Sequence, residues 1–175
     1  MRVIKLLSLL TISLLFTFCS SKSDKEIFDG AKGLLTEKKY DEACAAFEKF
    51  SIEQSSSELA PQAILECAKL YQGQVVKNVG GKESFIKAVD LYKKIFNDYP
   101  KSKEAENSLF MAGFILANEL SDLDSAKKTY ELFLEKYPEG DLADDAQVEL
   151  KNLGKSPEEI LMQKIQQENP NVNAS

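Results

Sequence analysis

The stretch Ser84–Pro100, which reads SFIKAVDLYKKIFNDYP, decides the fold of this chain. Its apolar residues recur at steps of three and one, which places them on one face of a helix. They are Phe85, Ala88, Val89, Tyr92, Ile95, Phe96 and Tyr99. Pro100 cannot continue a helix because it lacks a backbone N–H and its ring clashes with the preceding turn. The stretch therefore predicts an amphipathic helix that ends before Pro100.

The same apolar pattern recurs 38 residues later and 45 residues earlier. The later copy consists of Leu123, Ala126, Lys127, Tyr130, Phe133, Leu134 and Tyr137, with Pro138 in the place of Pro100. The earlier copy consists of Tyr40, Ala43, Cys44, Phe47 and Phe50. Only Lys127 departs from the apolar pattern. Recurrence at such a period is the signature of a repeat architecture, so the chain is predicted to contain three similar units.

A second helical run precedes each copy of the pattern. The three runs are Ile27, Phe28, Ala31, Leu34 and Leu35; then Ala63, Ile64, Cys67, Ala68 and Tyr71; then Leu109, Phe110, Ala112, Gly113, Leu116 and Ala117. Polar turns separate the members of each pair, and the middle turn, near 77–82, is longer and contains Gly80 and Gly81. Each unit is therefore predicted to be a helix, a turn and a second helix, which makes the fold all-α.

These units resemble the tetratricopeptide repeat (TPR). The family's pattern is a large residue, a small residue three positions later, an aromatic residue four positions after that and a proline eight positions further on. Phe85, Ala88, Tyr92 and Pro100 fit this pattern, and so do the corresponding residues of the third unit. The resemblance implies a right-handed superhelical stack of about three helix-turn-helix repeats over 26–153, acting in protein binding. The endings Tyr99-Pro100 and Tyr137-Pro138 resemble the TPR modules of bacterial envelope proteins. Two examples are the lipoprotein subunit of the outer-membrane β-barrel assembly machine and the periplasmic coordinator associated with the Tol–Pal system.

The C-terminal part predicts capping helices. Leu142, Ala146, Leu150 and Leu153 begin another first helix, but no aromatic second helix follows, as expected of the last unit of a solenoid. Gly154 suits a helix end, and Ser156-Pro157-Glu158-Glu159 suits the start of a final helix within 154–168. We expect this helix to pack through Ile160, Leu161 and Ile165, and 169–175 to form a disordered tail.

The N-terminal segment 1–18 is predicted to be a signal peptide. Arg2 and Lys5 precede a 13-residue apolar run, which is too short to span a bilayer comfortably. Cys19 then resembles the lipidated cysteine of bacterial lipoproteins, with 19–25 as a tether to the domain. Because Phe18 occupies a place that is normally small, ordinary signal-peptidase cleavage after Cys19 stays an alternative, and a retained membrane anchor is another.

The composition excludes several functions. The net charge is −6, and Arg2 is the only arginine, so a nucleic-acid partner is not expected. The chain has no histidine, which removes the commonest general base and metal ligand, and nothing offers a nucleophile–base pair. The cysteines lack a metal-binding spacing, while Asp122 and Asp124 are interpreted as helix-start residues rather than calcium ligands. We therefore predict a protein that is not an enzyme and has no cofactor and no metal.

The candidate partner contacts are the residues of each first helix that the repeat register turns toward the groove. They are Phe28, Lys32 and Leu35; Leu65, Lys69 and Gln72; and Phe110, Phe114 and Asn118. A subclass of the family binds peptide carboxylates through a lysine, asparagine and arginine set, which these positions lack. The alternative is that Phe28, Leu65 and Phe110 simply pack on one another within the stack.

Cys44 and Cys67 lie on the apolar stripes of successive helices. A buried free thiol is the first interpretation of each, because cysteine behaves as a small apolar residue. A disulfide between them is the alternative if the compartment is oxidising.

The sequence thus predicts a scaffold on the periplasmic side of the outer membrane that binds other envelope proteins or peptides. The alternative function is an envelope lipoprotein that captures a small molecule or a peptidoglycan fragment, for which a closed apolar pocket is expected.

Overall fold

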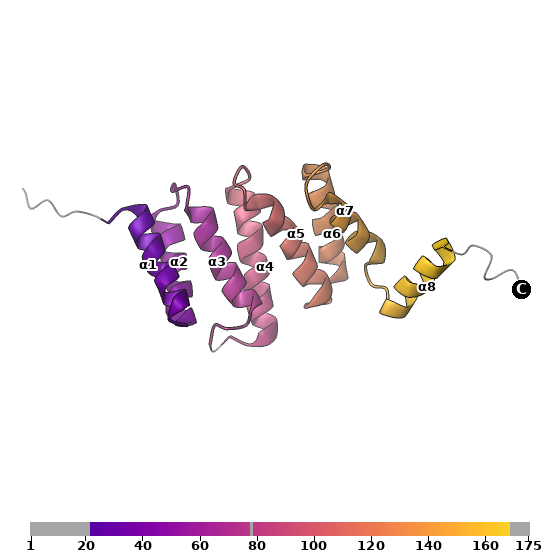
Figure 1. Cartoon of the computed structure of the whole chain (residues 1–175), viewed down its shortest axis with the longest axis horizontal. Coiled ribbons are helices and arrows are strands. Elements are labelled where there is room, and N and C mark those ends of the chain that lie inside the picture. Colours follow the sequence, from indigo (N-terminus) through magenta and orange to yellow (C-terminus); the bar gives the residue numbers. More distant parts are fainter. Residues whose placement is uncertain (1–21, 78, 169–175) are drawn as a thin grey trace, which may run out of the picture.

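A computed structural model describes residues 22–77 and 79–168 of the chain, and every regular element in this part is a helix. The elements are α1 (Asp24–Thr36), α2 (Tyr40–Glu53), α3 (Ala60–Gln72), α4 (Gly81–Asp98), α5 (Ala105–Asn118), α6 (Leu123–Lys136), α7 (Ala143–Asn152) and α8 (Pro157–Glu168). Figure 1 shows α1 to α7 standing side by side in chain order, with α8 beyond the end of the row. The predicted all-α stack is confirmed.

Each helix from α1 to α7 packs chiefly against its neighbours in sequence. The pairs α1–α2, α3–α4 and α5–α6 are the three predicted units. The small residue of the repeat pattern is fully buried in every unit, as Ala43, Ala88 and Ala126, and it lets the two helices of a unit approach closely. The aromatic residue four positions later is equally buried, as Phe47, Tyr92 and Tyr130. The core is therefore a continuous row of such layers along the stack.

The connections between units repeat the same hydrogen bonds. A backbone N–H at the start of the next helix donates to a carbonyl three residues earlier, from Ala60 to Ser57 (3.0 Å), from Ala105 to Ser102 (3.2 Å) and from Ala143 to Gly140 (3.0 Å). Before the last two of these connections stand Tyr99 and Tyr137, each with φ near −130° at the end of its helix. Pro100 and Pro138 follow, which confirms the predicted helix ends. The recurrence of the connection makes α7 the first helix of a fourth, incomplete unit.

Among the residues that the structure describes, the turn inside each unit contains one residue in the left-handed region. These residues are Lys38 (φ 59°), Gln74 (φ 53°) and Ser121 (φ 53°), none of which is a glycine. In the first unit, the Lys39 N–H donates to the Leu34 carbonyl at 2.9 Å, which is the hydrogen bond typical of a helix that ends this way. A side chain at such a position costs conformational energy that glycine does not pay.

We therefore expect Ser121→Gly to raise the free energy of unfolding by roughly 0.5–1 kcal/mol, because the strain removed exceeds the added entropy of the unfolded chain. Chemical denaturation followed by circular dichroism measures the change. The control is Ser125→Gly, within α6, which is expected to destabilise the fold by roughly a similar amount. Equal effects of the two substitutions would contradict the explanation.

The starts of two helices follow the predicted residues. Asp122 caps α6 by accepting a hydrogen bond from the Ser125 N–H at 3.1 Å, and bonds from Ser125 hold the pKa of this carboxyl below its usual value. Ser156 and Glu159 form the reciprocal pair before α8, with Ser156 N–H donating to Glu159 Oε2 at 2.7 Å and Glu159 N–H donating to Ser156 Oγ at 3.2 Å. Gly154, with φ 76°, follows α7 as expected.

The prediction for the packing of α8 is wrong in part. Leu161 is 58% exposed and Ile165 is 37% exposed, while Ile160 is half-buried. Figure 1 shows α8 beyond the end of the stack. The chain passes through the left-handed Gly154 just before α8, and helix formation does not bring the apolar face of α8 onto the core.

The first helix, α1, begins at Asp24, two residues before the expected start of the repeat domain at 26. The predicted signal peptide 1–18, Cys19 and the predicted tail 169–175 lie outside the described residues. Within the described part, no helix combines the length and the apolar character that crossing a membrane requires.

Candidate functional site

The nine predicted contact residues differ in how much surface they offer. Phe28 is buried; Leu35, Leu65, Gln72, Phe110 and Phe114 are half-buried; Lys32, Lys69 and Asn118 are exposed. They come from α1, α3 and α5, the first helices of the three units.

Phe28 and Phe110 hold the same place relative to the second helix of their units. The Phe28 ring lies 5.5 Å from that of Phe47 and 5.8 Å from that of Phe50. The Phe110 ring lies 5.8 Å from that of Tyr130 and 5.9 Å from that of Phe133, the residues that correspond to Phe47 and Phe50. Both phenylalanines therefore stabilise their own helix pair, and Phe28, at 3% exposed, has no surface left for a partner.

Three of the polar candidates already have partners within the chain. Gln72 Oε1 accepts a hydrogen bond from the Tyr92 hydroxyl at 2.6 Å. Lys69 Nζ lies 3.3 Å from a Glu66 oxygen, and Asn118 Nδ2 donates to the Phe114 carbonyl at 3.0 Å. Lys69 and Asn118 nevertheless keep exposed surface, because both pairs lie on the outside of the stack. The Lys69–Glu66 ion pair stabilises the fold little, as is usual for ion pairs at a surface.

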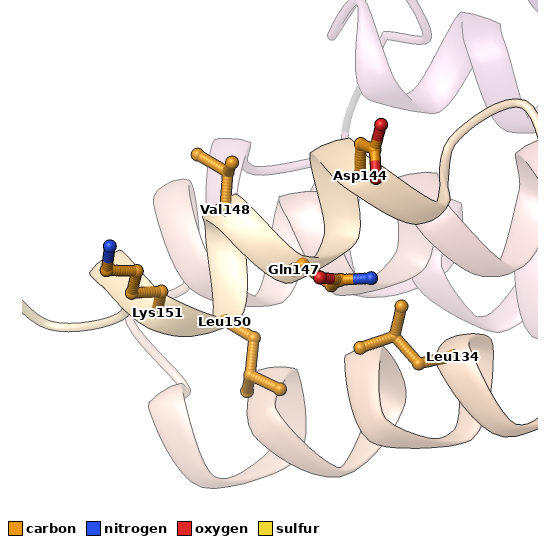
Figure 2. Close-up of a pocket in the computed structure, with 6 residues that line it drawn as sticks. All are labelled: Leu134, Asp144, Gln147, Val148, Leu150 and Lys151. Atoms are coloured by element: carbon orange, nitrogen blue, oxygen red, sulfur yellow. The ribbon is translucent and has the colours of Figure 1, made fainter. Parts of the chain in front are cut away.

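A hollow of about 560 Å³, at the C-terminal end of the stack, was not among the predicted sites. It is lined by Leu134 of α6 and by Asp144, Gln147, Val148, Leu150 and Lys151 of α7. In Figure 2, Leu134, Gln147 and Leu150 point toward the space between the two helices. Two charged side chains of opposite sign and three apolar ones thus surround a single opening.

The repeat register explains why this hollow exists. In α5, Leu109, Ala112 and Gly113 are buried beneath the second helix of their unit. The residues 38 positions later are Gln147, Leu150 and Lys151, and no second helix covers them. Because Lys151 replaces the small Gly113, a helix cannot approach α7 as closely as α6 approaches α5. The polar residues suit an open end of the stack.

Several exposed apolar side chains lie together at this end, while others, such as Ile52 of α2, are exposed elsewhere along the stack. Val148 is 54% exposed, and Leu161 and Met162 of α8 are 58% and 52% exposed. A second hollow, of about 120 Å³, lies between α7 and α8 and includes Val148, Lys151 and Ile160. Exposed apolar groups that lie together indicate an interaction surface more strongly than scattered ones do. We call this surface, formed by α7, α8 and Leu134, the C-terminal surface.

Below the C-terminal surface, the Tyr130 hydroxyl is buried without a hydrogen-bond partner. Its counterpart in the second unit, Tyr92, donates to Gln72, but Ala117 stands where Gln72 would be in the third unit. Burial raises the pKa of Tyr92 to about 12. Burial also raises the pKa of Tyr130, and the nearby Glu149 carboxylate raises it further. The Tyr92 hydroxyl therefore has a hydrogen-bond partner, whereas the equivalent hydroxyl of Tyr130 has none within the described part of the chain.

We expect Tyr130→Phe and Tyr92→Phe to have opposite effects on stability. Removing the unpaired hydroxyl of Tyr130 should raise the free energy of unfolding by about 1 kcal/mol, because an unsatisfied buried donor is unfavourable. Removing the hydroxyl of Tyr92 should lower it by about 1 kcal/mol through the lost bond to Gln72. Thermal and urea unfolding of the two variants test this, and destabilisation by both would show that the Tyr130 hydroxyl has a partner.

The structure joins Cys44 of α2 and Cys67 of α3 in a disulfide, with their Cα atoms 4.9 Å apart. The first interpretation, a buried free thiol at each position, is thus replaced by the alternative. The two residues lie at corresponding levels of neighbouring helices, which brings their sulfurs together although 23 positions separate them in sequence. Glu48 Oε1 lies 3.9 Å from the sulfur of Cys44 and 3.7 Å from that of Cys67.

A family model described as "Tetratricopeptide repeat" matches residues 107–140, which span the third unit from α5 to the connection before α7. No match to a curated protein was found. The chain therefore contains a tetratricopeptide repeat, and its helices form a TPR-like stack. Tetratricopeptide repeats generally mediate protein–protein interaction.

Proposed function

We propose that this protein is a non-catalytic interaction scaffold of the bacterial cell envelope. In this proposal it is a lipoprotein, exported through segment 1–18 and anchored through Cys19, and it assists the assembly or organisation of an envelope complex. The observation that carries the binding role is the C-terminal surface of a TPR-like stack, where exposed apolar residues surround an open hollow.

The C-terminal surface suits a short segment of another protein. Leu134, Leu150 and Val148 offer apolar contact, while Asp144 and Lys151 offer charges of both signs at the margin of the hollow. A short helix with an apolar face meets such a groove through residues spaced three and four apart, with its polar groups at the margin. Because Lys151 prevents close helix approach, the segment would contact α7 through side chains rather than through closely packed backbones.

Two features support the proposed location. The first is the charged start and apolar run of residues 1–18, which has the length of a secretory signal. The second is the Cys44–Cys67 disulfide, because such bonds persist in the oxidising compartments outside the cytosol.

Site-specific crosslinking in intact cells tests the binding surface. A photoreactive amino acid is placed at Gln147, beside the hollow, and in a second strain at Lys49 of α2, whose side chain is 71% exposed but lies at the other end of the stack. We expect a defined protein adduct from position 147 and none from position 49. Absence of any protein adduct at 147, with the variant present at normal abundance, would contradict the scaffold proposal at this surface.

Labelling with a clickable fatty acid tests the anchor. We expect the label to be incorporated into the wild-type protein and lost in Cys19→Ala, because this cysteine is the proposed acylation site. Equal label in both proteins, or in neither, would refute lipidation at Cys19 while leaving the crosslinking result unaffected.

A further inference from the structure

Three side chains of α2 and α3 bring atoms of metal-ligand type to one place. Cys44 and Glu48 are one helical turn apart on α2, and Cys67 faces them from α3. Their two sulfurs and one carboxylate oxygen all lie within 4.8 Å of one another. The sequence spacing gave no sign of this cluster, because its members come from two helices.

The chemistry of this set is that of a zinc site. Zinc binds cysteine thiolates and carboxylate oxygens, and three protein ligands with one further position make a common four-coordinate arrangement. The disulfide form offers no thiolate, so only the reduced protein has the complete donor set. Two thiolates and one carboxylate around a divalent cation would leave a local net charge of −1. The soft thiolate sulfurs favour a soft or borderline cation over calcium or magnesium.

We propose that the reduced protein binds one zinc-class divalent cation through Cys44, Cys67 and Glu48. Reduction by a phosphine cleaves the S–S bond and yields two thiols, while the phosphine takes up the oxygen of one water molecule and becomes its oxide. The cation then displaces one proton from each thiol as the two sulfur–metal bonds form. The disulfide and the metal are therefore alternative ways of joining α2 to α3.

The surroundings of the cluster favour such a site. Cys44 and Cys67 are 2% and 0% exposed, so the two sulfurs lie in the core between packed helices. Tyr71, one turn after Cys67 on α3, places its hydroxyl 3.4 Å from Glu48 Oε1, where it can donate a hydrogen bond to the carboxylate. Partners of this kind orient a ligand and strengthen a site. In the disulfide form, the helix pair thus already places the two sulfurs and the carboxylate side by side, and reduction would turn the sulfurs into ligands.

The test uses the full chain with Cys19→Ala in every sample, so that Cys44 and Cys67 are the only cysteines. Cadmium ion is titrated into the phosphine-reduced and the oxidised protein, and the ultraviolet charge-transfer band of cadmium–thiolate bonds is recorded. We expect one equivalent to bind to the reduced protein and no band from the oxidised protein. Zinc added afterwards should remove the band by competition.

Glu48→Gln separates the proposed ligand set from simple thiol binding. We expect it to weaken cadmium binding at least about tenfold, because a neutral amide replaces the charged oxygen donor. The matched control is Glu53→Gln on the same helix, which should bind like the parent. Circular dichroism confirms that each protein stays helical. Absence of a band at millimolar cadmium, or equal affinity of the Glu48 variant and the parent, would overturn the proposal.

Discussion

Gly113→Leu is expected to lower the free energy of unfolding by about 3 kcal/mol, because overpacking a closed core forces side chains and backbone apart. A Cβ atom at Gly113 would lie 2.9 Å from Tyr130 Cε1 and 3.1 Å from Tyr130 Cδ1, which is closer than such atoms approach. Tyr130 is fully buried, so its ring has nowhere to move. The α5 and α6 helices would have to separate, and urea unfolding followed by circular dichroism would show an earlier midpoint.

Gly30→Ala in α1 is the matched control for this prediction. It also places a side chain on a glycine of a first helix, but no atom lies within 4 Å of the Cβ position. Because alanine favours a helix more than glycine does, this variant should gain roughly 0.5–1 kcal/mol. Destabilisation by both substitutions would show that the loss in α5 does not come from contact with Tyr130.

The second large effect is expected from removing the disulfide. The double variant Cys44→Ala, Cys67→Ala should lose about 3 kcal/mol of stability, since a bridge that closes a loop of some twenty residues restricts the unfolded chain by that order. The loop is set by the sequence separation of 23 between the two cysteines. Thermal unfolding under non-reducing conditions measures the change.

Reduction of the unmodified protein gives an independent measure of the same bond. A phosphine reductant, in the absence of metal, should shift the midpoint of the parent toward that of the double variant and leave the double variant unchanged. An unaltered midpoint on reduction would contradict a disulfide that contributes to stability. Since α2 and α3 belong to different units, the loss should appear as weaker coupling between the first and second units.

Most of the fold could be predicted from the repeat pattern, because apolar residues at helical spacing mark the buried face of each helix. Ala88, Tyr92 and Ile95 recur at helical spacing, and all of them are buried in the structure. The helix ends could also be predicted, because Pro100 and Pro138 cannot continue a helix and Asp122 caps one. These are local properties of a few neighbouring residues, and a single sequence contains them in full.

The features that depend on distant residues could not be predicted in the same way. The hollow beside α7 arises because Gln147 and Lys151 stand at places that are apolar or small in α5, and because no second helix in the described part of the chain folds over α7. The direction of α8 depends on the backbone at Gly154, which the apolar residues of the helix do not determine. The meeting of Cys44 with Cys67 depends on how two helices pack.

The identical connections after α2, α4 and α6 have a consequence for the evolution of such a chain. Each connection leads from the end of one unit to the start of the next with the same geometry. The backbone hydrogen bonds from Ala60, Ala105 and Ala143 are its common feature. If a gene segment that encodes one unit were duplicated or deleted, the remaining units would therefore still be joined by a connection of the same geometry. The α7 helix would still be the last helix of the stack. The length of the protein can thus change in whole modules while its two ends, and whatever they bind, are inherited intact.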